Sequence, residues 1–190
     1  MNNTEYICHS GGCAGADITW EREGDKYNVH TISYSFYNHK QEGKNQKILT
    51  LDELQEGYNA ARIANKSLGR NFDSIQYPYV KNLLARNWFQ VKNSESIFAI
   101  SKRFISNTIV DGGTGWAIQM AIDNNKPIYV FDQVTNAWYT YTANNIFEPI
   151  VGAVPKLTKN FAGIGTRDLK DNGLNAIVNV YTTTFSESII

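Results

Sequence analysis

The chain has few cysteines and no excess of either charge, and these two shortages exclude several classes of protein. Its 190 residues contain only two cysteines, Cys8 and Cys13, too few for a disulfide framework. Lys plus Arg and Asp plus Glu number 18 each, so the formal net charge is zero. Because a protein that binds nucleic acid usually carries a basic surface, this balance argues against nucleic acid as the main partner.

The sequence also lacks a long apolar run and the pattern of a signal peptide. No stretch approaches the roughly 18 consecutive apolar residues that a membrane helix needs. The first residues, MNNTEY, contain neither a basic nor an apolar segment. We therefore expect a cytoplasmic protein without a membrane partner. Cysteine and histidine are too few and too irregularly spaced for a structural metal site, so we predict neither a metal nor a bound cofactor.

What is present is the pattern of one folded α/β domain. Hydrophobic residues make up 42% and charged residues 19% of the chain, as in ordinary folded proteins. Short apolar stretches such as KPIYVFD (residues 126–132) alternate with helical patterns. This alternation predicts a single Rossmann-like domain over residues 1–190, with a mostly parallel sheet and helices on both faces.

Local chemistry also predicts where several elements begin and end. Thr50 with Glu53 three residues later makes a capping box, so we expect a helix over residues 51–68 that stops near Gly69. Pro78 opens a second helical segment, over residues 79–91. Three further predictions are a strand over residues 108–110, a helix from about Trp116 to Asp123, and an edge strand over residues 137–142.

Two glycine-rich stretches each follow a predicted strand and precede a predicted helix. They are SGGCAGAD, from Ser10 to Asp17, and DGGTGW, from Asp111 to Trp116. Glycine lets a ligand approach the backbone, and successive N–H groups can form a nest for phosphate. In open α/β sheets, ligands bind where two such stretches face each other at the carboxyl ends of strands. We therefore predict a cleft for phosphate or ribose between them, although each stretch alone could be only a tight turn.

The predicted ligand-binding residues come from these stretches and from two later positions. They are Ser10, Gly11, Gly12, Gly15, Asp17, Asp111, Gly112, Gly113, Thr114, Gly115, Trp116, Gln119 and Arg167. Neither stretch is a Walker motif, because no Gly-Lys-Ser/Thr follows, and neither matches the dinucleotide-binding GxGxxG. NAD-dependent hydride transfer is therefore not expected.

Three separated motifs together resemble the SLOG superfamily of Rossmann-like proteins. They are SGGCAGAD, GGTGWAIQMA followed by KPIYVFD, and GIGTRDL. The superfamily is related to the DNA-processing protein DprA and to the LOG enzymes that release cytokinin bases. The branch that looks most similar is the YpsA-related group, sometimes described as molybdenum carriers. The resemblance implies a Rossmann-like fold, a nucleotide ligand and a homo-oligomer.

The resemblance also implies that the LOG type of catalysis is missing. LOG enzymes carry a GGxGTxxE motif with a catalytic Glu, and in this chain Gln119 occupies the Glu position. Glutamine cannot ionise and therefore cannot act as a general base. We predict a protein that binds a nucleotide or ADP-ribose-type small molecule, cyclic ones included. Such a protein would be a sponge or sensor of a nucleotide immune signal in a phage or a bacterium.

Two other functions stay open on the sequence alone. A hydrolase of nucleotide N-glycosidic or phosphodiester bonds would use Asp17 or Asp111, although Asp17 could simply cap a helix and Asp111 could simply order its loop. The other function is DprA-like binding of single-stranded nucleic acid, which the charge balance disfavours. Cys13 could act as a nucleophile only with a base beside it, and His9 is the only local candidate.

Overall fold

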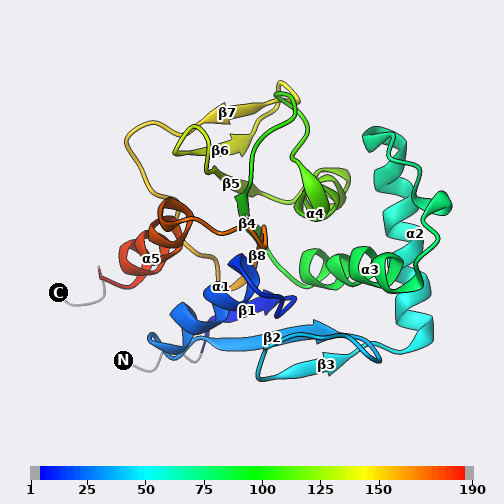
Figure 1. Ribbon diagram of the computed structural model, residues 1–190. Coiled ribbons are helices and arrows are strands. Elements are labelled where there is room, and N and C mark those ends of the chain that lie inside the picture. The colour runs from blue at the N-terminus through cyan, green and yellow to red at the C-terminus, as the bar shows by residue number, and fades with distance from the viewer. Residues whose placement is uncertain (1–4, 187–190) are drawn as a thin grey trace.

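One sheet of eight strands runs through residues 5–186, the part of the chain that this computed structural model describes (Figure 1). Its strand order is β3-β2-β1-β8-β4-β5-β6-β7. The strands are β1 (Ile7–Ser10), β2 (His30–Ser35), β3 (Gln46–Ile48), β4 (Ser96–Ser101), β5 (Ile128–Asp132), β6 (Ala137–Tyr141), β7 (Phe147–Pro149) and β8 (Asn160–Gly165). The helices are α1 (Ala16–Asp25), α2 (Leu51–Leu68), the short 3-10 helix η1 (Phe72–Ser74), α3 (Pro78–Lys92), α4 (Gly112–Asp123) and α5 (Asp171–Phe185).

The prediction of an α/β domain with a mostly parallel sheet is confirmed. Strands β3, β2, β1, β8, β4 and β5 run parallel to one another, and the two antiparallel pairs between residues 5 and 186 are β5–β6 and β6–β7. Strand β4, SIFAIS, is buried along its whole length. A parallel strand covered by helices on both faces needs such a nearly continuous apolar run.

Helices cover both faces of the sheet (Figure 1). Helices α1 and α5 lie together on one face, where Trp20 and Tyr181 pack against Phe98 and Phe161 of the sheet. Helices α2, α3 and α4 cover the other face over a second apolar cluster that includes Trp116. Each face therefore has its own core, and the rims of the sheet remain for loops.

Local chemistry predicted several boundaries correctly. Thr50 and Glu53 form the capping box at the start of α2, with both reciprocal hydrogen bonds present. The same helix ends at Gly69, which has φ 62° in the left-handed region. Pro78 is the first residue of α3, where its missing N–H costs nothing.

Two predicted elements and the start of one predicted helix were wrong. Residues 108–110 form no strand, because Val110 makes only an isolated bridge to Phe104. Helix α4 starts at Gly112 and not near Trp116, because the Asp111 side chain accepts a hydrogen bond from the Gly112 N–H and caps the helix there. Strand β6 is not an edge strand, because β7 pairs along its outer side.

None of the helices between residues 5 and 186 combines the length and apolarity that a membrane span requires.

Candidate ligand-binding site

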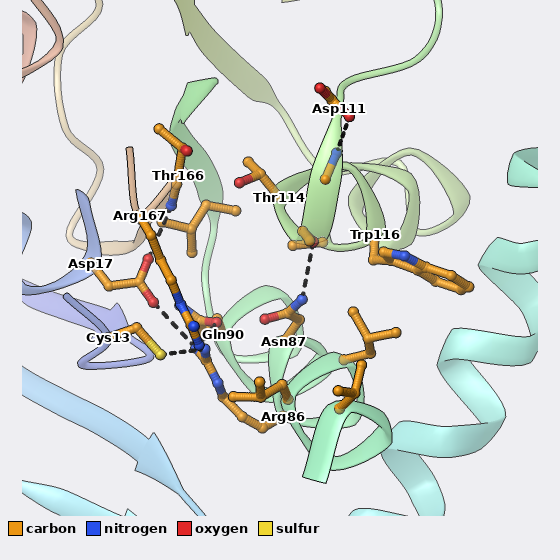
Figure 2. Close-up of a pocket in the computed structure, with 18 of the residues that line it drawn as sticks. Cys13, Asp17, Arg86, Asn87, Gln90, Asp111, Thr114, Trp116, Thr166 and Arg167 are labelled. Atoms are coloured by element: carbon orange, nitrogen blue, oxygen red, sulfur yellow. Dashed lines mark hydrogen bonds and ion pairs between the residues drawn. The ribbon is translucent and has the colours of Figure 1, made fainter. Parts of the chain in front are cut away.

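A cavity of about 530 Å³ opens at the carboxyl ends of β1, β8 and β4 (Figure 2). From β1 the chain continues outward to β2, and from β4 it continues outward in the opposite direction to β5, with β8 between them. This is the switch point at which open α/β sheets bind ligands. The volume lies within the range of small-molecule sites.

The first turn of α4 forms one wall of the cavity. A Cβ atom added at Gly112 or Gly113 would meet no atom within 4 Å, so the backbone there faces open space. The first N–H groups of a helix have no intrahelical partner, and Asp111 satisfies only that of Gly112. Bare backbone at a helix N-terminus is an arrangement that binds anions.

A buried arginine that the sequence analysis did not single out faces this turn across the cavity. Arg86 of α3 is 5% exposed, and Figure 2 shows its side chain reaching toward Cys13 and Asp17. Its Nη1 donates to Asp17 Oδ2 at 3.3 Å and to Gln90 Oε1 at 2.8 Å, and its Nη2 donates to Cys13 Sγ at 3.3 Å. Its Nε has no hydrogen-bond partner among the described residues. The guanidinium therefore has one carboxylate neighbour and an unused donor.

The first glycine stretch accommodates groups of the protein itself. A Cβ atom at Gly11 would overlap the Arg86 guanidinium, and one at Gly12 would overlap the side-chain amide of Gln41. A Cβ atom at Gly15 would lie 2.6 Å from the Arg167 backbone. A larger residue would not fit at these three positions, because Arg86, Gln41 and the segment after β8 occupy the space beside them.

Asp17 and Asp111 both line the cavity, in opposite electrostatic surroundings. Asp17 is 5% exposed, and burial raises its pKa above the usual range although Arg86 acts against this shift. It does not cap α1: its Oδ1 accepts the Gly165 N–H at 3.0 Å and ties α1 to β8. Asp111 is the N-cap of α4, and a hydrogen bond from Arg103 lowers its pKa.

The cavity brings together only part of the predicted set. The predicted residues that line it are Asp17, Asp111, Gly112, Gly113, Thr114, Trp116 and Arg167. Those that do not are Ser10, Gly11, Gly12, Gly15, Gly115 and Gln119.

The residues outside the cavity have structural contacts. The Ser10 hydroxyl accepts the Gly12 N–H at 3.1 Å and so holds the first stretch together. Gly115 lets α4 approach Val110 closely, because a Cβ atom there would overlap the Val110 carbonyl oxygen. Gln119 donates to Asp123 Oδ1 at 2.9 Å on the same helix.

The residues that line the cavity carry more positive than negative charges, although the whole chain has no net formal charge. Its charged lining consists of Arg70, Arg86, Lys102, Arg167, Asp17 and Asp111. The sequence contains one usable signal for Arg86: it and Gln90, one helical turn later, occupy the inner stripe of α3 among apolar residues. A polar residue on the buried face of a helix indicates that this face contacts polar groups and not only the apolar core.

Among the described residues, no three His, Cys, Asp or Glu side chains gather closely enough to hold a metal ion. No family model, curated protein or solved structure matches this chain with significance. The resemblance to the SLOG superfamily therefore stays a prediction, and the functional argument rests on the cavity itself.

Proposed function

We propose that the protein binds a phosphate-bearing small molecule, a nucleotide or an ADP-ribose-type compound, in the cavity between α3 and the first turn of α4. One observation carries the proposal: the Arg86 side chain lines a cavity whose other wall is bare helix N-terminus, so a cation and free backbone N–H groups border the same space. Arg86 has a single carboxylate partner, Asp17, and phosphate binds a guanidinium through charge-assisted hydrogen bonds.

The shape of the cavity supports a two-part ligand. A phosphate would lie between Arg86 and the N–H groups at Gly113 and Thr114, where charge and hydrogen bonds act together. The wall beyond is apolar, with Ile75, Val80, Leu83 and Leu84 in the lining. Such a surface suits the flat face of a base, whereas free phosphate would leave it unused.

The proposed activity is retention of an intact ligand. Gln119 lies outside the cavity and contacts Asp123, so it contributes no acid or base to a guest. A protein that holds a nucleotide without changing it acts as a sponge or a sensor, and we place this chain in that class.

The test uses a pair of variants at Gly113. Gly113→Asp puts a carboxylate into the open space at the helix N-terminus, where it suits the helix dipole but repels phosphate. Gly113→Asn has the same shape without the charge. Purified protein is incubated with NAD, ADP-ribose, cyclic ADP-ribose isomers, cyclic dinucleotides and nucleoside monophosphates, and the retained compounds are identified by mass spectrometry.

We expect the wild-type protein and Gly113→Asn to retain one intact compound per subunit, and Gly113→Asp to retain none. Thermal unfolding of each variant checks that the fold is preserved. Equal retention by Gly113→Asp and Gly113→Asn would place the ligand elsewhere, and no retention by the wild-type protein would reject the proposal.

A hydrolase of nucleotide N-glycosidic or phosphodiester bonds is the second candidate, and Asp17 supports it. A carboxyl group whose pKa is raised by burial inside a cavity is the kind of group that exchanges protons with a substrate. In the same incubation, a hydrolase would give products that exceed the protein concentration. Asp17→Asn would stop their formation, whereas Asp111→Asn would not.

A further inference from the structure

Cys13 lies on the wall of the cavity between two nitrogen-containing side chains. Its Sγ is 3.5 Å from His39 Nε2 and 3.3 Å from Arg86 Nη2. His9 is the only base near Cys13 in the sequence, but its Nδ1 pairs with the Tyr34 hydroxyl at 3.0 Å. The base beside the thiol is His39, which comes from the segment after β2.

His39 is oriented to accept a proton from the thiol. Its Nδ1 lies 3.2 Å from Ser35 Oγ, and its ring stacks on Phe36 with centroids 4.5 Å apart. With the ring proton on Nδ1 donated to Ser35, the lone pair of Nε2 points to Cys13. Burial, together with the charges of Arg86 and Arg167, lowers the pKa of His39 to about 4, so the ring is neutral near pH 7.

Two buried side chains with an unused donor line the same cavity as the thiol. Gln90 is 1% exposed and its Nε2 has no hydrogen-bond partner among the described residues, and the same holds for Arg86 Nε. Both side chains line the cavity together with Cys13, and Figure 2 draws them beside it. The polar side chains around the sulfur therefore offer more N–H donors than acceptors.

We propose that Cys13 is a nucleophile with His39 as its base, and that it reacts with small peroxides to give a sulfenic acid. The Sγ proton passes to His39 Nε2, and the sulfur attacks one peroxide oxygen. The S–O bond forms as the O–O bond breaks, and the departing oxygen takes the proton from His39 and leaves, for hydrogen peroxide, as water. The sulfur loses two electrons, and the peroxide gains them.

The structure favours a small, neutral oxidant over a bulky electrophile. Cys13 is only 7% exposed, so a large reagent cannot reach the sulfur without moving the wall. An arginine beside the sulfur and a helix N-terminus close by both favour negative charge on it during the attack.

Cys8 provides an internal control. It is fully buried, and burial raises the pKa of its thiol well above the usual range. A buried thiol in an apolar core is inert toward oxidants. One chain therefore carries one thiol that we expect to react and one that we expect not to.

The experiment is oxidation of the full-length protein with hydrogen peroxide, with dimedone present to trap sulfenic acid and peptide mass spectrometry to locate it. We expect the label at Cys13 and none at Cys8. In the wild-type protein, Cys13 should react at least about tenfold faster than glutathione under the same conditions. This comparison needs no variant and does not depend on the proposed ligand.

His39→Gln tests the base, and His30→Gln is the matched control because His30 is exposed and outside the cavity. We expect the rate at Cys13 to fall at least about tenfold in His39→Gln and to stay unchanged in His30→Gln. Ser35→Ala, which only frees the His39 ring, should give a smaller loss. A wild-type rate no faster than glutathione, or an unchanged rate in His39→Gln, would overturn the proposal.

Discussion

Single residues near the cavity carry charges that burial makes costly. Arg86 and Asp17 are each 5% exposed and form an ion pair with 3.3 Å between Nη1 and Oδ2. Breaking such a pair leaves one buried charge uncompensated, which costs more than the pair itself contributes. The pair therefore holds α3 against the start of α1 whether or not a ligand is bound.

Arg86→Met should lower the free energy of unfolding by about 3–5 kcal/mol, because Asp17 is left buried without its cation. Urea unfolding measures this loss. The double variant Arg86→Met/Asp17→Asn should be more stable than the single variant, because both charges are gone. A single variant as stable as the wild-type protein would mean that solvent already screens the pair.

His39 gives the protein a dependence of stability on pH with a defined sign. Its pKa is about 4 in the folded protein, against 6.5 as the ordinary value, because of burial and then of Arg86 and Arg167. Between these values the unfolded chain binds more protons, so stability is full above about pH 6.5 and falls as the pH drops toward 4.

We expect the melting temperature of wild-type protein to fall more between pH 7 and pH 5 than that of His39→Gln. Burial raises the pKa of carboxyl groups such as Asp17, but these groups are present in both proteins. The difference between the two pH profiles therefore isolates the contribution of His39. His30→Gln, which changes an exposed ring, should follow the wild-type curve. Identical pH profiles for wild-type and His39→Gln would show that the ring stays solvated.

At the scale of elements, the start of α4 shows where sequence patterns succeed and fail. The three glycines of DGGTGW suggested a loop, but Gly112, Gly113 and Gly115 are all inside the helix. Two of them leave open space beside the cavity, and Gly115 admits the Val110 carbonyl. Glycine content alone cannot distinguish these two uses, because they depend on what lies opposite.

Gly113→Ala and Gly115→Ala should therefore have opposite effects on stability. Alanine at position 113 meets no atom within 4 Å and improves helix propensity, so the free energy of unfolding should rise by about 0.4–1 kcal/mol. Alanine at position 115 overlaps the backbone of Val110 and should cost about 1–3 kcal/mol. Denaturant unfolding measures the free energy of unfolding of both variants. Equal changes in this free energy would contradict the different packing around Gly113 and Gly115.

Elements with local signals were predicted well, and those that depend on partners were missed. The capping box at Thr50 and the proline at the start of α3 act within one helical turn, so the sequence alone shows them. Strands β3 and β7 have three residues each and form because a neighbouring strand is in register. Three residues are too few to show the alternation of apolar and polar side chains that predicts a strand.

At the scale of the whole molecule, the site joins segments that are far apart in the sequence. The cavity takes residues from the stretch after β1, from α3, from α4 and from the end of β8. The place of the site was predictable, because parallel strands bring their carboxyl ends to one edge. Arg86 was not, because its partners Cys13 and Asp17 lie about 70 residues earlier in the chain.

A ligand that touches all these segments should stabilise the entire domain in one cooperative step. At a concentration of about 100 times its dissociation constant, it adds about 2.7 kcal/mol to the free energy of unfolding. For a domain of this size, that raises the melting temperature by about 5–11 °C. Circular dichroism and tryptophan fluorescence should report the same shift, because the Trp residues lie in both cores.

Gly113→Asp should show no such shift with the compound that the wild-type protein retains, whereas Gly113→Asn should shift as the wild-type protein does. The two variants differ only in one negative charge at the start of α4, so the comparison isolates the electrostatic contribution to binding. A shift seen by only one of the two probes would mean that the ligand does not stabilise the domain in one step, and the four segments would then not be coupled through the cavity.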